Sequence, residues 1–313
     1  MLDVRGKTAF ITGGASGMGW GMAKAFAEAG MKVIIADVRQ DALDTAMEGF
    51  SNTNFAVHAI RLDVADRDGW EKAADEAEAQ FGNIHVLALN AGVGVTGSML
   101  TATYKDWDFN MNVNVGGVIN GVVTMLPRML KHGEEGQIVV TSSTGGFSAV
   151  GGAGLYCAAK FCVAGMFESL ATDLRGTSLG ASVFFPGPVQ TQLGQSTQAT
   201  RPEHLRNDAP PPPPEAVGGK KDARPSPGFD PSLFMTSEEV GQRVLRGIER
   251  RDLFIMTHPE FTRGIEARNA ALLRAIPHEA TNEARAALVA QFGTLMYNPI
   301  YDKQQPLTEP LGE

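Results

Sequence analysis

The stretch "TAFITGGASGMG" at residues 8–19 decides the fold, because it joins a short apolar strand directly to a glycine-rich turn. A helical pattern follows the turn and runs to Gly30. Gly13, Gly17 and Gly19 carry no side chain that would hold the backbone away from a bound pyrophosphate. The start of the helix also offers free N–H groups and the positive end of its dipole. A glycine-rich turn in this position predicts a dinucleotide-binding α/β fold.

Six further apolar runs follow at the spacing that helical crossovers need. They are "KVIIAD" (32–37), "AVHAIRLDV" (56–64), "HVLALNAG" (85–92), "QIVVTSS" (137–143), "ASVFFPG" (181–187) and "LFIMTH" (253–258). Strands that alternate with helices in this way predict the doubly wound α/β class, a Rossmann-type parallel sheet of seven strands with helices on both faces. We therefore expect residues 1–313 to form a single Rossmann-type domain.

Residues 194–236 are a Pro-rich insertion that interrupts the alternation of strands and helices. Its central part, 206–232, has too much Pro and Gly to form a helix or a central strand. The insertion is either a surface loop or a substrate lid over the active site. After it, Ser237 is expected to cap the next helix, with acidic residues in the first turn that suit the helix dipole.

Residues 259–313 predict a C-terminal helical extension. Two amphipathic helices are expected within it, at about 260–275 and 281–292, followed by a polar tail. The two helices either cap the pocket or form a subunit contact.

The composition narrows the classes of partner and the compartment. A formal net charge of -8 with an isoelectric point near 5.3 argues against nucleic-acid or anionic-membrane partners, which need a basic face. No signal pattern and no apolar run of membrane-spanning length is evident. The two cysteines, Cys157 and Cys162, are poorly placed to bridge on one helix and suit a reducing, cytoplasmic location. The histidines show no ligand spacing, so no metal site is expected.

Polar residues that follow the strands point to a cofactor. Asp37 closes the second run, where a carboxylate accepts hydrogen bonds from both ribose hydroxyls and repels a 2′-phosphate. NAD is therefore favoured over NADP, although Arg39, two residues later, is able to hold such a phosphate. Asp63 ends the third run, either beside an adenine ring or as a plain surface carboxylate. After the fourth run, Asn90 can bind backbone groups and Gly92 lets the chain pass close to the cofactor.

One pair of residues points to acid–base chemistry. Among four tyrosines, only Tyr156 has a lysine, Lys160, one helical turn later, so the two side chains are neighbours on a helix. An ammonium beside a phenol stabilises the phenolate and is expected to lower the phenol pKa toward working pH. Such a phenol is a useful general acid and base.

Two polar positions extend this pair, each with a competitor. Ser143 ends the fifth run and can hydrogen-bond a substrate carbonyl, although Ser142 is adjacent. Asn114 falls on the helix after the fourth strand and can hold a water that relays protons from Lys160, while Asn112 lies two residues away on a different face.

Together these motifs resemble the classical short-chain dehydrogenase/reductase (SDR) family over about residues 5–193, and more loosely to 258. The resemblance implies a catalytic tetrad of Asn114, Ser143, Tyr156 and Lys160, and it selects Asn114 over Asn112. It also implies a homodimer or homotetramer. Two departures from the family pattern are Leu89 and the long 194–236 region. The implied cofactor contacts are Gly13, Ser16, Gly17, Met18, Gly19, Asp37, Arg39, Asp63, Val64, Asn90, Ala91, Gly92, Tyr156, Lys160, Pro186, Gly187, Val189 and Thr191.

Shorter segments, "GGFSAVGGAGLYCAAK", "INGVVTMLPRM" and "LFIMTHPEF", are similar to bacterial Cα-dehydrogenases that oxidise benzylic alcohols of lignin-derived aryl ethers. We therefore expect an NAD-dependent oxidoreductase that interconverts a secondary alcohol and a ketone, with a hydrophobic aryl substrate. The alternatives are a hydroxysteroid dehydrogenase, a 3-oxoacyl reductase, and a non-catalytic dinucleotide-sensing protein. Candidate pocket walls are Phe147, Val150, Leu155, Phe185 and Leu193.

Overall fold

The computed structural model describes residues 1–209, 212, 230–293 and 298–307. At its centre lies a parallel sheet of seven strands in the order β3-β2-β1-β4-β5-β6-β7. This confirms the predicted doubly wound fold. The strands are β1 Thr8–Thr12, β2 Lys32–Asp37, β3 Val57–Arg61, β4 Val86–Leu89, β5 Gly136–Thr141, β6 Leu179–Phe185 and β7 Phe254–Met256.

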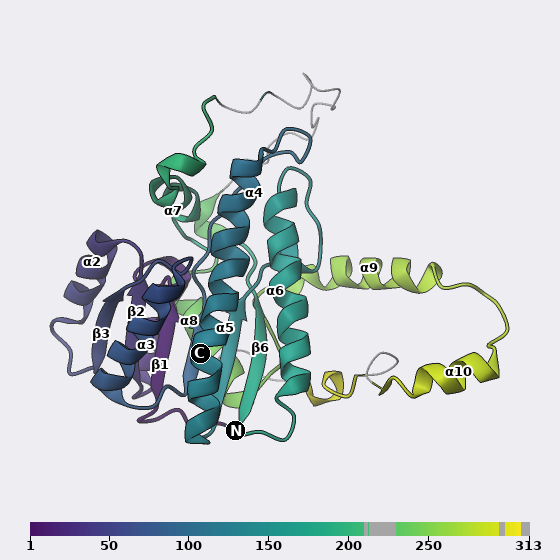
Figure 1. Cartoon of the computed structure of the whole chain (residues 1–313), viewed down its shortest axis with the longest axis horizontal. Coiled ribbons are helices and arrows are strands. Elements are labelled where there is room, and N and C mark those ends of the chain that lie inside the picture. The colour runs from purple at the N-terminus through teal and green to yellow at the C-terminus, as the bar shows by residue number, and fades with distance from the viewer. Residues whose placement is uncertain (210–211, 213–229, 294–297, 308–313) are drawn as a thin grey trace.

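Helices cover both faces of the sheet (Figure 1). Strand residues alternate between two cores, so that Phe10 faces α3, α5 and α6 while Ile11 faces α1, α2 and α8. The helices are α1 Gly17–Glu28, α2 Gln40–Phe50, α3 Arg67–Phe81, α4 Tyr104–Met111, α5 Gly117–His132, α6 Gly154–Asp173, α7 Leu193–Thr200, α8 Ser237–Arg250, α9 Thr262–Arg274 and α10 Glu283–Ala290.

The strand order reverses between β1 and β4, and this reversal positions the site. Strands β1 and β2 run parallel with Thr12 beside Ala36, and β1 also pairs with β4. The residues that follow these strands therefore emerge at one edge of the sheet. In open α/β sheets this is the edge where ligands bind.

Helices α1 and α8 touch backbone to backbone. A Cβ atom on Gly21 would lie 1.8 Å from the carbonyl oxygen of Ser237, and one on Gly241 would lie 2.1 Å from the carbonyl oxygen of Gly21. Both distances are far inside van der Waals contact, so only glycine fits at these two positions. This contact holds α1, which begins within the glycine-rich stretch, against a helix that lies more than 200 residues later in the chain.

The start of α8 differs from the prediction by one residue. Thr236, and not Ser237, is the N-cap, and its side chain accepts a hydrogen bond from the Glu239 backbone N–H. The Glu239 carboxylate accepts in return from the backbone N–H of Thr236, at 2.7 Å. The reciprocal bonds of this capping box decide the helix start. The sequence TSEE offers two adjacent hydroxyls, and only the first has its glutamate three residues later.

Two regions lie outside the sheet and its covering helices. Helices α9 and α10, within the predicted ranges, extend away from the body as an arm (Figure 1), and neither has a buried residue. The chain returns to α6, where Tyr301 donates a hydrogen bond to Glu168 and Asn298 donates to Thr172. Most of the Pro-rich stretch predicted at 206–232 lies outside the described residues.

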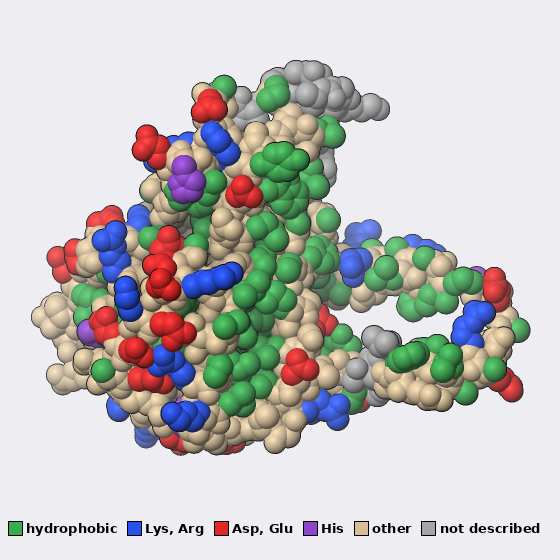
Figure 2. Space-filling model, in the orientation of Figure 1, with side chains coloured by type: hydrophobic (Ala, Val, Ile, Leu, Met, Phe, Trp, Pro, Cys, Tyr) green, Lys and Arg blue, Asp and Glu red, His purple; other side chains and the backbone are tan. Residues whose placement is uncertain are grey.

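One helical run, Tyr104–His132, is long and apolar enough by composition to cross a membrane. It comprises α4, a π-helical turn at Asn112–Gly116 and α5, and it places Val118, Met125 and Met129 in the core against the sheet. Other side chains of α5 are exposed, including Ile119, Val123 and Leu130. In Figure 2 hydrophobic side chains gather along this helix on the visible face.

Candidate active site

The glycine-rich turn has the backbone shape that the sequence predicts. Gly13 and Gly17 have φ values of +61° and +51°, a region that favours glycine. A Cβ on Gly13 would lie 2.9 Å from the Cα of Ala91, and a Cβ on Gly19 would lie 2.0 Å from the carbonyl oxygen of Gly13. Within the described part of the chain no side chain caps the start of α1, because Ser16 is extended and makes no capping bond. The first N–H groups of α1 therefore remain open to an anion.

Asp37 lies beside this turn at the end of β2. One carboxylate oxygen accepts a hydrogen bond from the backbone N–H of Arg39, 3.1 Å away, and the carboxylate also interacts with the backbone of Ala15. Burial raises the pKa of Asp37 above its usual value, and these hydrogen bonds oppose the rise. Asp63 stands two residues after the end of β3, where its carboxylate accepts from the backbone N–H of Ala65 at 2.9 Å.

Asn90 ties three strand ends together. Its amide donates to the carbonyl oxygens of Thr12 and Gly13, at 3.1 and 3.4 Å, and its Oδ1 accepts from the Thr141 hydroxyl at 3.1 Å. The Thr12 hydroxyl accepts from the backbone N–H groups of Asn90 and Ala91. Thr12 and Thr141 thus support the site, although the sequence reading did not single them out.

Asn114 is buried, whereas Asn112 is exposed. The amide of Asn114 donates to the carbonyl oxygen of Val93 and to Oδ1 of Asn110, both at 2.9 Å, and its Oδ1 accepts from the Val93 N–H at 3.1 Å. Both of its N–H groups are therefore used within the fold. Asn110 in turn donates to the carbonyl oxygen of Leu155 at 2.8 Å, which connects Asn114 to the first turn of α6.

Gly92 passes close to the lysine and the asparagine. A Cβ at this position would lie 2.7 Å from Oδ1 of Asn114 and 3.5 Å from Nζ of Lys160. Lys160 is buried, with only 4% of its surface exposed, and its ammonium donates to the carbonyl oxygen of Thr141 at 2.9 Å. Burial lowers the pKa of Lys160 to about 8.

Tyr156 is half-buried one turn before Lys160, and its hydroxyl hydrogen-bonds with the Ser143 side chain. Burial is the largest influence on the Tyr156 pKa and raises it above 10, while the bond with Ser143 opposes the rise. The expected lowering of the phenol pKa by Lys160 is thus wrong for the chain without a cofactor. The lysine amine points instead to the end of β5.

The adjacent serine has a different partner. The Ser142 hydroxyl donates to the backbone carbonyl oxygen of Lys160 at 2.8 Å and is fully buried. The hydroxyl of Ser143 faces Tyr156 and also accepts from the N–H of Gly145 at 3.1 Å. Of the two serines, Ser143 therefore borders the Tyr156 phenol.

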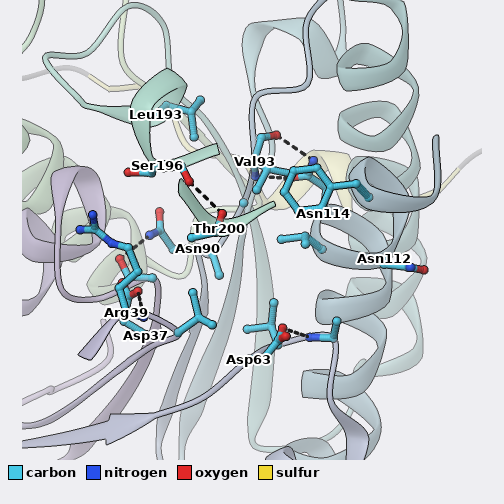
Figure 3. Close-up of a pocket in the computed structure, with 18 of the residues that line it drawn as sticks. Asp37, Arg39, Asp63, Asn90, Val93, Asn112, Asn114, Leu193, Ser196 and Thr200 are labelled. Atoms are coloured by element: carbon cyan, nitrogen blue, oxygen red, sulfur yellow. Dashed lines mark hydrogen bonds between the residues drawn. The ribbon is translucent and has the colours of Figure 1, made fainter. Parts of the chain in front are cut away.

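These elements border a cavity of about 320 Å³. Figure 3 shows Asp37 and Asp63 on one side of it, with Leu193 and Ser196 across from them. Among the predicted site residues, the cavity is lined by Gly13, Ser16, Gly17, Met18, Asp37, Arg39, Asp63, Val64, Asn90, Ala91, Gly92, Asn114, Tyr156, Lys160 and Thr191.

Five predicted residues lie outside this lining: Gly19, Ser143, Pro186, Gly187 and Val189. Val189 forms an isolated bridge with Met235, and the N–H of Gly187 donates to the Thr257 hydroxyl at 2.9 Å. Of the predicted pocket walls only Leu193 lines the cavity. Phe147 and Phe185 pack edge to face against each other instead, with ring centroids 5.3 Å apart.

Apart from Leu193, the sequence reading singled out no residue of α7 or of the short 3-10 turn Glu203–Leu205, although a lid over the active site was one of its two interpretations of 194–236. This segment lies in the region interpreted as an insertion, yet it contributes a group of lining residues: Gln192, Leu193, Ser196, Thr200, Pro202, His204 and Leu205. Thr197 fixes it to the strand side, since the Gly94 N–H donates to the Thr197 hydroxyl at 2.8 Å. The composition of "LGQSTQAT" is polar and gives no apolar stripe that would have revealed the helix.

The model of one protein family, described as short chain dehydrogenase, matches residues 7–202. The chain belongs to this family. The matched part of this short-chain dehydrogenase contains both the glycine-rich turn and the Tyr156–Lys160 pair, which confirms the resemblance seen in the sequence.

Individual relatives agree with this assignment. This short-chain dehydrogenase is 35% identical to the C alpha-dehydrogenase of Sphingobium sp. strain NBRC 103272/SYK-6, over 90% of this chain and 91% of the relative. The predicted likeness to Cα-dehydrogenases is thus confirmed. It is 34% identical to a diacetyl reductase, (S)-acetoin forming, of Staphylococcus aureus, over 61% of this chain and 74% of that protein. A short-chain dehydrogenase/reductase from Burkholderia phymatum, solved in complex with NAD, superposes with a TM-score of 0.78 at 32% identity, covering 90% of this chain and 100% of that one.

Proposed function

We propose that this protein interconverts a secondary alcohol and a ketone, with NAD as the hydride carrier. The observation that carries the proposal is the placement of the Tyr156 hydroxyl beside Ser143 and one turn from Lys160, at the edge of the sheet that holds the glycine-rich turn. A binding protein that only senses a dinucleotide needs the turn but has no use for this group of side chains.

The residues present fit a dinucleotide. The positive φ angles of Gly13 and Gly17 and the open first turn of α1 form a cradle that a Cβ would fill. Gly13, Ser16, Gly17 and Met18 would hold the phosphates, and Asp63 with Val64 would border the adenine. Bound there, the nicotinamide supplies the acceptor for the hydride.

The four side chains of the tetrad have different roles. The Ser143 hydroxyl orients the substrate oxygen. The Tyr156 phenolate takes the proton of that oxygen when the alcohol is oxidised, and the Tyr156 phenol returns it when the ketone is reduced. Lys160 keeps a positive charge behind the phenol and binds cofactor hydroxyls. Since both N–H groups of the Asn114 amide are bound within the fold, Asn114 acts by holding Val93 and the start of α6 in place.

Asp37 supports NAD over NADP. Its carboxylate lies at the end of β2 on the cavity wall, where it would accept hydrogen bonds from the ribose hydroxyls and repel a 2′-phosphate. The Burkholderia neighbour, crystallised with NAD, agrees with this choice. Arg39 lines the same cavity and is the residue that would favour NADP.

We infer a hydrophobic aryl alcohol as the substrate class, with a benzylic hydroxyl. The relationship to the Sphingobium C alpha-dehydrogenase, which extends over nine-tenths of both chains, supports this inference. A hydroxysteroid dehydrogenase and a 3-oxoacyl reductase are the competing activities.

The deciding experiment is an absorbance assay for reduced nicotinamide, run with NAD and with NADP against aryl carbinols, hydroxysteroids, 3-hydroxyacyl thioesters and acetoin. We expect turnover of aryl carbinols with NAD. Activity on steroids alone would overturn the substrate class, and a strong NADP preference would show that Arg39 outweighs Asp37. Cofactor binding without turnover of any alcohol or ketone would favour the sensing alternative.

We also propose a homodimer or homotetramer in the cytoplasm. The exposed apolar side chains of α5, Ile119, Val123 and Leu130, support a subunit contact. Light scattering of the purified protein at two concentrations tests it, and a monomer at both would contradict it.

A further inference from the structure

Asp106 joins α4 to the segment that follows α7. It is the third residue of α4, where its carboxylate closes a capping box with Thr103. The same carboxylate accepts from Nη2 of Arg201 at 2.7 Å and from Nδ2 of Asn207 at 2.9 Å. The Asp106 side chain is 11% exposed and that of Arg201 is 18% exposed, so this ion pair is mostly withdrawn from water.

Arg201 also organises its own segment. Its Nε donates to the carbonyl oxygen of Leu205 at 2.7 Å, and its guanidinium lies 5.5 Å from the centre of the Phe109 ring. The guanidinium therefore binds the 3-10 turn to α4 by a salt bridge, a backbone hydrogen bond and a cation–π contact. Asn207 adds a further connection, since its Oδ1 accepts from the Thr103 hydroxyl at 2.8 Å.

The carboxylate of Asp106 is well matched to this role. Burial alone would raise its pKa, but hydrogen bonds from Thr103, Arg201 and Asn207 outweigh the burial and lower it. The side chain thus stays ionised across the neutral range. Removing the guanidinium would leave a largely buried carboxylate short of a partner, which is much less favourable than losing a surface ion pair.

The segment held in this way is one wall of the cavity. Leu193 and Ser196 of α7 lie across the cavity from Asp37 and Asp63 (Figure 3), and Thr200, Pro202 and Leu205 also line the cavity. At its start the segment is fixed by the Gly94–Thr197 hydrogen bond, and at its end by the Asp106–Arg201 pair. A molecule bound in the cavity would therefore contact this wall.

We propose that Arg201 and Asp106 form a positioning pair that holds residues 193–207 against the cavity and sets how fast the dinucleotide leaves. This proposal rests on the proposed function for the identity of the ligand. The position of residues 193–207 against the cavity does not depend on the proposed function, because it is a property of the chain alone.

The test replaces Arg201 with methionine, which keeps the unbranched stem of the side chain, removes the guanidinium and leaves the Thr103–Asp106 capping box in place. The matched control is Arg206→Met, which removes a cation from the same segment at an exposed position, where Nε lies 3.4 Å from the Arg201 carbonyl oxygen. Hydrogen exchange of residues 193–207 is measured in the cofactor-free protein, with β1 and β4 as internal references for global unfolding. Release of NADH is then followed by stopped-flow fluorescence.

In R201M we expect exchange of residues 193–207 and release of NADH to become roughly 10- to 100-fold faster, as loss of a charge-assisted hydrogen bond implies. Exchange in β1 and β4 should not change, and R206M should match the wild type. A KM for the cofactor that rises more than kcat falls would distinguish a positioning role from a catalytic one.

Equal exchange of residues 193–207 in R201M and R206M would overturn the proposal. If R201M does not fold, Arg201→Lys decides: it keeps the charge but cannot bind both Asp106 and Leu205 in the same geometry, and it must show the same faster exchange to a smaller degree. A wild-type protein that binds no NAD would sink the proposed function, while the exchange comparison would still judge the pair.

Discussion

The ammonium of Lys160 lies 5.5 Å from the centre of the Tyr156 ring and donates its hydrogen bond to the carbonyl oxygen of Thr141. The lysine is therefore held behind the tyrosine by the end of β5, and it does not contact the phenol oxygen as a direct partner. Burial dominates both side chains, since it raises the pKa of Tyr156 and lowers that of Lys160 to about 8. Both shifts are opposite to those that a direct ion pair between the two side chains would produce.

Tyr156→Phe is expected to abolish turnover while leaving the dinucleotide bound. The substitution removes the hydroxyl that exchanges a proton with the substrate but keeps the ring, and a general acid–base contributes about 10²- to 10⁴-fold in rate. Steady-state kinetics and fluorescence titration with NADH measure the two effects. Rates equal to those of the wild type would end the catalytic assignment.

Lys160→Met is expected to inactivate the protein and yet stabilise it at neutral pH. The fall of the Lys160 pKa from 10.5 to about 8 corresponds to roughly 3 kcal/mol against folding. Loss of the bond to Thr141 offsets part of this, so we expect a gain of about 1–3 kcal/mol in the free energy of unfolding. Denaturant unfolding of both proteins measures it.

The difference in the free energy of unfolding between Lys160→Met and the wild type should fall as pH rises. Between pH 8 and 10.5 the unfolded lysine keeps its proton while the folded one loses it. The unfolded chain therefore binds more protons in this window, and the wild type gains stability relative to the variant as pH rises. An advantage of the methionine variant that stays constant up to pH 10.5 would contradict the burial of a charged amine.

Asn110→Leu tests the connection between Asn114 and α6. Leucine is similar in size but leaves the amide of Asn114 and the carbonyl oxygen of Leu155 without their partner, which is expected to cost about 2 kcal/mol of stability. We also expect a lower kcat, because the start of α6 carries Tyr156. Asn112→Ala, at an exposed position of the π-helical turn that holds Asn114, is the control and should change stability by about 0.5 kcal/mol or less.

Thr236→Ala should weaken the start of α8 by about 1 kcal/mol, since it removes the capping hydroxyl. Ser237→Ala, one residue later, should be close to neutral. Thermal unfolding of the two variants, side by side, distinguishes the capping box in the structure from the cap expected from sequence. The reverse ranking would restore Ser237 as the cap.

The sequence predicts the sheet and the functional residues at its edge because both are local in origin. Each strand is a short apolar run, and the glycines of the turn, Asp37 and the Tyr156–Lys160 pair stand at fixed distances from these runs. The pattern of one sequence is then enough to place these residues in one site, since parallel strands bring all their carboxyl ends to one edge of the sheet.

The position of α7, on the other side of the cavity, depends on long-range contacts that the sequence pattern does not predict. Helix α7 lies over the cavity because Gly94 and Asp106, about a hundred residues earlier, bind Thr197 and Arg201. No periodicity in 193–205 indicates this. In the same way Phe147 and Phe185 were candidate pocket walls because the likeness to Cα-dehydrogenases suggests an aryl pocket, whereas in the structure the two rings pack against each other.

The contact of Gly21 with Ser237 and Gly241 has a consequence for how such a protein can diversify. With no room for even a methyl group, the two helices meet in one arrangement, whatever length of chain connects β6 to α8. Insertions, deletions or wholesale exchange of that connection can accumulate while the phosphate-facing helix keeps its place. A new substrate selectivity can then be acquired by exchanging the segment between β6 and α8, without any change in the half of the molecule that holds the coenzyme.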